Sequence, residues 1–345
     1  MMFLVQACCA PTRIWARRPK IWMAAAEGNG AGVAQPPPPP PPPVVGQEPF
    51  RHLDEIGPGF WNLRGSFTLA KGLVDAGNHM SFLRLGSGSI LVVDALGKYS
   101  PDASTAAEVQ HEIDVLTNCG RWMEAVVFTH PFHTGGVEVF HRTYPDVPMY
   151  GAPRHLDRFP HIPWAGVLTD EAVRARWEPA VSMRIPAGTE YVKPVPEAFN
   201  HLSTCLVFHR ESRTLHADDF FQYFDRIWDK MGKLAWGVLK ALGIKDGMLL
   251  FHNSLKSGGL AGSAENPILL IASVEEMLCQ WDMENICTAH NGVLRGNARH
   301  RVRELLEATK PALRKLSEKM AKGEGLEPAE TSHMWGRHEK ETECG

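Results

Sequence analysis

The feature that most constrains the fold is a repeated pattern, in which a short apolar run is followed by a histidine or an aspartate. Short apolar runs without alternation are typical of buried strands. A hairpin brings the start of its first strand and the end of its second strand to one edge of a sheet. The pattern therefore predicts a sheet with several metal-binding side chains along one edge. These side chains are His130 and His133 after "AVVF", His201 and Asp218 at the two ends of a hairpin, and His290 after "NICTA".

Helical patterns alternate with the apolar runs. A strand pair is expected around Gly86, with its second strand ending at Asp94, and helices are expected between the later strands. Because hairpins occur as well as alternation, an α/β sandwich fits better than a purely parallel sheet. The expected helices are one capped by Asp102 or Ser104, a short one from Gly136 to Tyr144, one in the aromatic-rich segment 220–255, one capped by Ser273, and one from about Asn297 with a break near Pro311.

The two ends of the chain differ in composition from its middle. Residues 1–47 contain eight consecutive prolines at 36–43 and no acidic residue before Glu27. Such a segment buries too little apolar area to offset the entropy of ordering it, so a disordered extension is expected. A basic, acid-free start is also compatible with a transit peptide for a plastid or mitochondrion. We therefore expect one globular domain over 48–322 and a disordered tail over 323–345.

Overall composition excludes several classes of protein. The 345 residues are 44% hydrophobic, as in ordinary globular domains, and carry a net charge of −3, which does not favour nucleic acid. Apolar runs such as "GMLLF" are far shorter than the roughly 20 residues that cross a bilayer, so no membrane partner is expected. Seven cysteines without regular spacing indicate free thiols in a reducing compartment, and hence a cytoplasmic protein unless the start is a transit peptide.

Each candidate ligand also has an ordinary interpretation. The chain has 16 histidines, and a single one is more often a surface or capping residue than a ligand. Asp218 is also placed to cap a helix beginning at "DFFQYF", and His209 and His216 are interpreted as ordinary strand residues. Imidazoles together with a carboxylate suit zinc, iron or manganese, so the joint order of the five residues favours a metal site.

In that order, "TH…HTGG", an isolated His201, "LHADDFF" and "TAHNG" resemble the metallo-β-lactamase superfamily. The pattern of that family is T-H-x-H-x-D-H-x-G-G, then a histidine, a strand ending in G-D, and a final G-H. The resemblance spans roughly residues 70 to 295. It implies a four-layered αβ/βα sandwich with a metal site at one edge, between two sheets. It also implies hydrolysis of esters, thioesters, lactones, β-lactams or phosphodiesters, or the redox chemistry of the iron-containing branches.

The chain departs from the family pattern between residues 128 and 133. Aligned without a gap, Phe128 replaces the first histidine, Phe132 replaces the aspartate, and His130 and His133 match the second and the last histidines. With two residues deleted, His130 becomes the first histidine instead. Both registers remain open at this stage.

The resemblance implies a metal-dependent hydrolase of a small ester, thioester or related substrate. Zn²⁺ or Fe²⁺ is the expected cofactor, as one or two ions, with His130, His133, His201, Asp218 and His290 as ligands and Asp218 orienting the attacking water. Two alternatives stay open. One is an inactive member that binds a ligand or partner and no metal, since Phe128 and Phe132 put apolar bulk where water is activated. The other is an iron-dependent oxidoreductase, since two histidines and one carboxylate suit ferrous iron.

Overall fold

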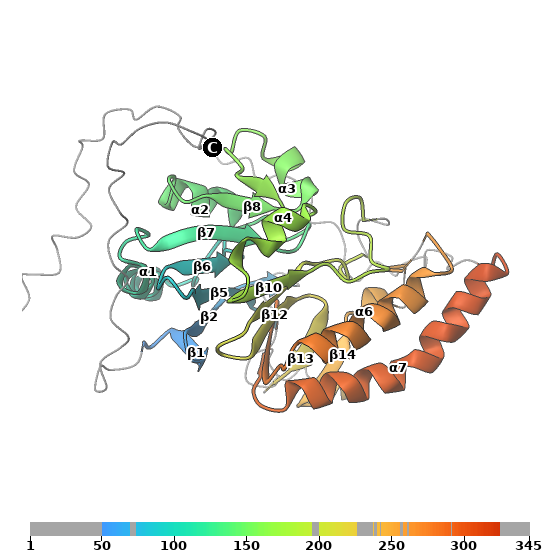
Figure 1. The fold of residues 1–345 in the computed structure, drawn as a ribbon. Coiled ribbons are helices and arrows are strands. Elements are labelled where there is room, and N and C mark those ends of the chain that lie inside the picture. The colour runs from blue at the N-terminus through green and yellow to red at the C-terminus, as the bar shows by residue number, and fades with distance from the viewer. Residues whose placement is uncertain are drawn as a thin grey trace, which may run out of the picture.

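The computed structural model describes residues 50–69, 74–194, 200–225, 237, 240–241, 243–255, 258–260, 262–290 and 292–324. The predicted N-terminal extension and all of the predicted tail beyond Glu324 lie outside these residues. The described chain forms two facing sheets with helices on their outer sides (Figure 1). No helix in these ranges is long and apolar enough to cross a membrane.

The first sheet, here called the N-terminal sheet, has seven strands in the order β1-β2-β5-β6-β7-β8-β9. Its first half is antiparallel, whereas β6 to β9 run parallel to one another. The strands are β1 (Leu53–Gly57), β2 (Phe60–Gly65), β5 (Asn78–Arg84), β6 (Ile90–Val93), β7 (Met123–Phe128), β8 (Met149–Gly151) and β9 (Gly166–Val167).

The second sheet, here called the C-terminal sheet, has five strands in the order β10-β11-β12-β15-β16. The predicted hairpin is β11–β12, and β15 lies parallel to β12. These strands are β10 (Val181–Arg184), β11 (Leu206–His209), β12 (Thr214–Asp218), β15 (Asn285–Thr288) and β16 (Val293–Leu294). Two small ribbons pair β3 (Thr68–Leu69) with β4 (Val74–Asp75) and β13 (Phe221–Phe224) with β14 (Met248–Phe251).

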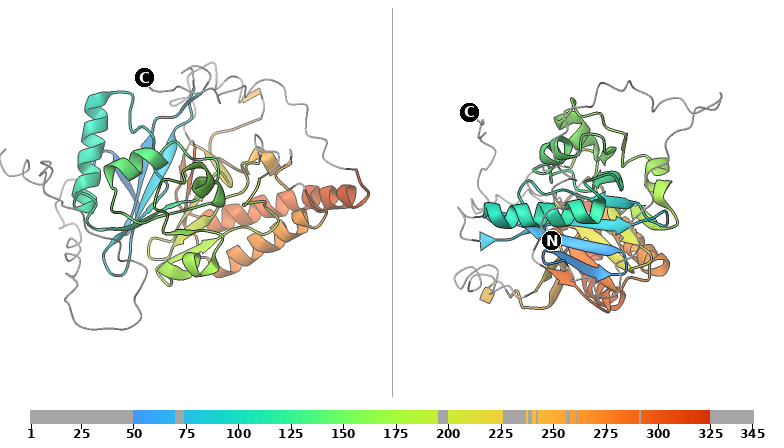
Figure 2. Two further views of the ribbon diagram at one scale, coloured as in Figure 1. Left: turned by 90° about the horizontal axis from the view of Figure 1, so that it is seen from above. Right: turned by 90° about the vertical axis from the view of Figure 1, so that its left-hand side faces the viewer.

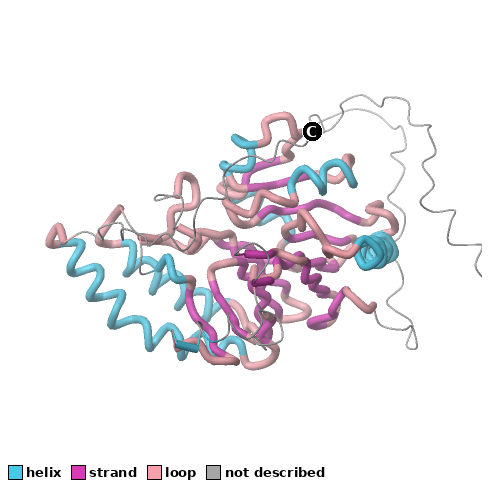
Figure 3. The backbone as a smooth tube through the Cα atoms, turned by 180° about the vertical axis from the view of Figure 1, so that it is seen from behind, coloured by secondary structure: helices cyan, strands magenta, loops and turns pink. Residues whose placement is uncertain are grey.

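Helices α1 and the α6–α7 pair lie on opposite sides of the strands (Figure 2), and the strands occupy the centre of the molecule (Figure 3). The helices are α1 (Ala103–Thr117), α2 (Val137–Thr143), α3 (Pro153–Arg158), α4 (Glu171–Arg174), α6 (Asn266–Gln280) and α7 (Ala298–Ala321), with short 3-10 turns at Ala175–Trp177 and Asn253–Leu255. This is the four-layered αβ/βα sandwich of the metallo-β-lactamase type that the sequence predicts.

Three separate cores hold the layers together. Val109 and Ile113 of α1 pack with β5, β6 and β7 on the outer face of the N-terminal sheet. Leu270 of α6 and Val302 of α7 do the same on the C-terminal sheet. Between the sheets, apolar residues of β2, β6, β11 and β15 form the third core. Alternate residues of a strand point to opposite faces, so each sheet is apolar on both sides and must lie between two layers.

The helix predictions are confirmed in part. Asp102 caps α1 by accepting a hydrogen bond from the Thr105 amide, and α2 lies where it was expected. The helix expected over the aromatic segment is wrong at its start, because Phe221–Phe224 is strand β13; Trp228 and Trp236 lie outside the described residues. Ser273 lies inside α6 rather than at its start. No break occurs at Pro311, because α7 packs on α6 on both sides of it, through Leu306 and Leu313.

Candidate metal centre

The carboxylate of Asp219 lies among four histidines, and we call these five residues the Asp219 cluster. Asp219 itself is only 2% exposed. Its Oδ2 atom lies 3.2 Å from His133 Nε2 and 3.2 Å from His201 Nδ1. More distant are His290 Nε2, at 3.7 Å from Oδ1, and His130 Nε2, at 3.9 Å from Oδ2. The histidines come from three loops that follow or precede strands of both sheets, so the cluster lies at the edge where the two sheets meet.

The backbone turn at the end of β12 places Asp219 there. In a regular strand the side chains of Asp218 and Asp219 would point to opposite faces. Asp218 instead has a φ of 48°, in the left-handed region, and its Oδ1 accepts a hydrogen bond of 2.6 Å from the Asp219 amide. Aspartate is one of the few residues that adopt this conformation at modest cost, since its short side chain can bond to the local backbone. Both carboxylates therefore face the same edge.

The imidazoles of His133 and His290 are held in orientations suited to metal ligands. His133 donates from Nδ1 to the carboxylate of Asp218, whose Oδ1 and Oδ2 lie 3.0 and 3.2 Å away, while its Nε2 faces Asp219. His290 donates from Nδ1 to the carbonyl oxygen of Gly77 at 2.6 Å, which leaves Nε2 facing Asp219. A partner on the far nitrogen that fixes the tautomer and the ring orientation is a general feature of metal-binding histidines.

His201 and His130 differ from each other in how their nitrogens are used. His201 is the most open member, with 32% of its side chain exposed, and only its Nδ1 contacts Asp219. His130 is fully buried, accepts at Nδ1 from the amide of Phe132, and donates from Nε2 to the carbonyl oxygen of His201, both at 3.2 Å. By distance, one ligand atom each of His130, His133, His201 and Asp219 lie within 4.8 Å of one another. By hydrogen bonding, however, His290 is freer than His130 to be the fourth ligand.

Burial and charge act in opposite directions within the cluster. Burial, together with the neighbouring His133, holds the pKa of His130 well below its usual value. Burial alone would also lower the pKa of His133, but the carboxylates of Asp218 and Asp219 outweigh it and raise that pKa well above its usual value. For Asp219, burial is outweighed by His290 and His133, which hold its pKa well below the usual range. The cluster therefore favours a negative carboxylate with a cation beside it.

The donor set fits a divalent cation. Three imidazoles and one carboxylate match the nitrogen and oxygen ligands that zinc takes in four-coordinate sites, and the same donors suit ferrous iron. No side chain among the described residues of the cluster is a thiol, which removes the softer sites preferred by copper(I). His133, His201 and Asp219 are common to the arrangement by distance and to the arrangement by hydrogen bonding.

The structure brings four of the five predicted ligands together. Asp219 takes the place of the fifth, Asp218. His130, His133, His201 and His290 all face Asp219, which the sequence analysis missed. Asp218, the predicted carboxylate ligand, lies one layer further in, grouped with Asp94 and His216. The signal that could have found Asp219 is the doubled aspartate in "HADD". His252 was also missed; its ring lies 5.5 Å from that of His201, and burial lowers its pKa to about 4.

The two phenylalanines of the motif lie in different places. Phe128 points away from the cluster into the outer core, where its ring meets those of Phe140 and Trp164 at 6.3 and 5.9 Å. Phe132 lies at the cluster, 5.0 Å from the ring of His201, and the guanidinium of Arg154 covers it at 4.9 Å. The expectation that Phe128 adds apolar bulk at the site is therefore wrong. The placement favours the register with two residues deleted, in which His130 is the first histidine.

A second group of buried polar side chains lies directly behind the cluster. We call Asp94, Thr129, His216 and Asp218 the Asp94 group; each is at most 4% exposed. Asp94 follows β6 and accepts from the Thr129 amide at 2.8 Å, and the Thr129 hydroxyl oxygen lies 2.7 Å from its Oδ2. The hydroxyl of Thr129 also lies 3.0 Å from Asp218. The Asp94 group thus joins the ends of β6, β7 and β12 and fixes the start of the loop that carries His130 and His133.

No protein-family model matches the chain, and no curated protein matches it. Solved structures that it resembles include the metallo-β-lactamase FIM-1 from Pseudomonas aeruginosa in its mono-zinc form, at 12% identity over 75% of this chain and 96% of that one, with a TM-score of 0.44. A metallo-β-lactamase from Hirschia baltica shares 14% identity over 76% and 97%, with a TM-score of 0.45. A diflavin flavoprotein fragment from Nostoc sp. shares 11% over 79% and 98%, with a TM-score of 0.47.

Proposed function

We propose that this protein is a zinc-dependent hydrolase of a small ester, thioester or related substrate. The observation that carries the proposal is the buried Asp219 carboxylate facing four histidines at an edge where His201 is open to solvent. A buried carboxylate among imidazoles is costly unless a cation compensates it. An exposed member on the rim gives a substrate access to the same place.

The ligands that we assign are His133, His201, Asp219 and His290. A bound zinc ion supplies a Lewis acid and lowers the pKa of a bound water. Asp218 holds His133 through Nδ1, and Gly77 holds His290 in the same way. Phe67, whose ring stacks on that of His290 at 5.2 Å, and Phe132, whose ring lies 5.0 Å from that of His201, line two sides of the rim.

Metal content and hydrolysis of the purified full-length protein test this proposal. Wild type should carry sub- to near-stoichiometric zinc and hydrolyse a generic aryl ester or thioester. His201→Ala should lose both the metal and the activity. His300→Ala is the matched control, because that histidine lies on the exposed face of α7, paired with Glu304, and should change neither.

The outcomes separate the candidate functions. Zinc with hydrolysis supports the proposal, and iron in place of zinc favours the oxidoreductase. If neither wild type nor His201→Ala binds metal, the inactive, ligand-binding alternative is supported. The apolar ring of Phe132 beside His201 favours that alternative. Equal metal content in wild type and His201→Ala would remove the site as described.

A further inference from the structure

A chain of buried polar side chains crosses the core between the two sheets and ends at the Asp94 group. It runs from Asn62 of β2 to Ser81 of β5, and then to His216 of β12. All three are buried, at 3, 0 and 0% exposure, beside the apolar core between the sheets. Buried polar groups are retained where they are hydrogen-bonded, and here each one bonds to the next.

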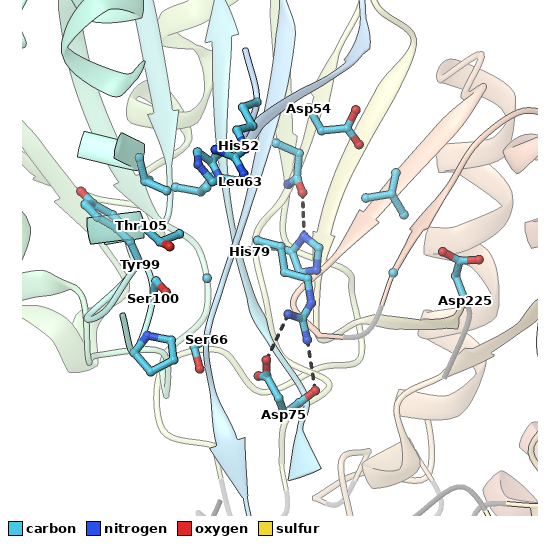
Figure 4. Close-up of a pocket in the computed structure, with 18 of the residues that line it drawn as sticks. His52, Asp54, Leu63, Ser66, Asp75, His79, Tyr99, Ser100, Thr105 and Asp225 are labelled. Carbon is cyan, nitrogen blue, oxygen red and sulfur yellow. Dashed lines mark hydrogen bonds and ion pairs between the residues drawn. The ribbon is translucent and has the colours of Figure 1, made fainter. Parts of the chain in front are cut away.

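The outer end of the chain reaches a cavity of about 770 Å³ that Asn62 and His79 help to line (Figure 4). His79 lies 2.6 Å from the side-chain oxygen of Asn62, so its Nδ1 is the donor. The amide nitrogen of Asn62 then donates to Ser81 Oγ at 3.0 Å. No residue of the Asp219 cluster lines this cavity. The chain therefore starts outside the metal centre and reaches it through the Asp94 group.

Every hydrogen in this chain points toward Asp94. The carboxylate oxygen Asp94 Oδ2 can only accept, so His216 Nε2, 2.9 Å away, donates to it. In the neutral imidazole Nδ1 is then the acceptor, and the hydroxyl of Ser81, which accepts from Asn62, donates to it at 2.9 Å. Hydrogen bonds that run in one direction polarise one another, so the final bond to Asp94 is strengthened by those before it.

The bond from His216 to Asp94 affects which carboxylate receives the hydroxyl hydrogen of Thr129. Its hydroxyl has one hydrogen and lies between two carboxylates, 2.7 Å from Asp94 Oδ2 and 3.0 Å from Asp218 Oδ2. Asp94 has two other donors, the Thr129 amide and His216. With both in place, the hydroxyl hydrogen is available to Asp218, whose carboxylate also accepts from His133 Nδ1.

We propose that His216 is a positioning residue for the metal centre, which acts by donating to Asp94 and so leaves the Thr129 hydroxyl to orient Asp218 and, through it, His133. This inference rests on the metal site of the proposed function, but not on hydrolysis. It assigns a role to a histidine that sequence analysis interprets as an ordinary strand residue.

Two amide substitutions at one position test the inference. In His216→Gln the side-chain amide reaches as far as imidazole Nε2 and keeps a donor for Asp94. In His216→Asn the amide reaches only as far as Nδ1, so it keeps a partner for Ser81 and loses Asp94. The measurements are zinc affinity by chelator competition, the absorption spectrum of the cobalt(II) form, and urea unfolding of the metal-free protein.

We expect His216→Gln to bind zinc within about threefold of wild type, and His216→Asn to bind about tenfold more weakly. This is the lower end of the effect of losing a direct outer partner of a metal ligand, because His216 acts on His133 only through the Asp94 group. The cobalt spectrum should change in His216→Asn alone. A purely structural role would lower the stability of both variants without separating their affinities.

Equal zinc affinity in the two variants would overturn the inference and leave the proposed function standing. A wild-type protein that binds zinc but hydrolyses nothing would remove the hydrolase and keep the inference, whereas failure of wild type to bind any metal removes both. If His216→Asn does not fold, Thr129→Val decides, because it keeps the backbone amide that bonds Asp94 and removes the hydroxyl that the inference assigns to Asp218. Loss of that hydroxyl should weaken zinc binding at least threefold, and an unchanged affinity would again overturn the inference.

Discussion

The Asp219 cluster and the Asp94 group contain the same kinds of residue and use them in opposite ways. In the Asp94 group neighbouring polar atoms lie 2.7 to 3.0 Å apart, and no member is open to solvent. In the Asp219 cluster the histidines approach one carboxylate at 3.2 to 3.9 Å, and His201 is partly exposed. A group of aspartates and histidines therefore does not by itself indicate a metal site. The better indication is a set of imidazole nitrogens that face one carboxylate.

The difference also separates two tasks. The tightly bonded Asp94 group fixes the ends of three strands, and the looser Asp219 cluster is carried on the loops that begin there. Sites built on rigid elements and supported by a second layer of hydrogen bonds hold their geometry well. Substitutions in the Asp94 group should therefore mainly lower stability, and substitutions in the Asp219 cluster should mainly change metal binding.

The largest expected effect on stability comes from Asp94→Ala. The change leaves the Thr129 amide and His216 Nε2 buried without an acceptor, so the free energy of unfolding should fall by about 3–5 kcal/mol. Asp219→Ala should cost less than about 2 kcal/mol, because the histidines near the rim can reach water. Urea unfolding of both variants without metal measures this, and equal losses would contradict the division of tasks.

A buried histidine without a carboxylate partner should respond to pH in the opposite sense to His133. Burial lowers the pKa of His155 to about 4, below its unfolded value near 6.5. The folded state therefore disfavours the charged form, and stability present above pH 6.5 is lost as the pH falls toward 4, by up to about 3 kcal/mol.

His155→Asn keeps an acceptor for the Ala152 amide and removes this titration. Between pH 6.5 and pH 4 the variant should lose less stability than wild type. The slopes of the unfolding free energy against pH should differ by the amount expected for roughly one bound proton. Urea unfolding at several pH values gives both slopes. Identical slopes in wild type and variant would contradict this prediction, because they would mean that His155 binds its proton equally well in the folded and the unfolded states.

A smaller effect is expected from adding a carboxylate to the cluster. Phe132→Asp should raise zinc affinity by about tenfold, roughly 1.4 kcal/mol, by placing a charged oxygen beside His201 and His133, and should raise ester hydrolysis. Phe132→Asn has the same shape without the charge and is the matched control. Equal affinity of these two variants would mean that the added carboxylate pairs with Arg154 instead of the metal.

The companion change, Phe128→His, should add no ligand. Its ring lies in the outer core, so the substitution should leave zinc affinity unchanged and lower stability by about 3 kcal/mol through lost packing. A gain in zinc affinity here would restore the ungapped register that the structure disfavours.

Much of the fold could be predicted because its signals are local. Apolar runs such as "AVVF" become β7, and the hairpin and the final strand lie where the pattern indicates. The errors share one cause, which is packing that local patterns do not contain. Pro311 continues in a helix because α6 supports both of its sides, and "FQYF" is a strand because it pairs with β14.

The site was predictable as a set of histidines, but not in its carboxylate. Strand alternation and the family pattern both point to Asp218, the last residue of β12. What places Asp219 in the cluster is the left-handed φ of Asp218. The doubled aspartate in "HADD" offers two carboxylates at this point, but the sequence pattern does not indicate which of them turns toward the histidines. His216 was undetectable for a similar reason, since its partners Ser81 and Asp94 belong to the other sheet.

The central claim is that Asp219 binds the metal and Asp218 only orients His133. Zinc titration of wild type, Asp218→Ala and Asp219→Ala by equilibrium dialysis tests it most directly. Asp218→Ala should still bind zinc at saturation, with an affinity 10- to 100-fold weaker, as expected for an outer partner of a ligand. Asp219→Ala should lose more affinity than that. If Asp218→Ala loses the metal while Asp219→Ala retains it, the assignment of the two carboxylates is reversed and the account is wrong.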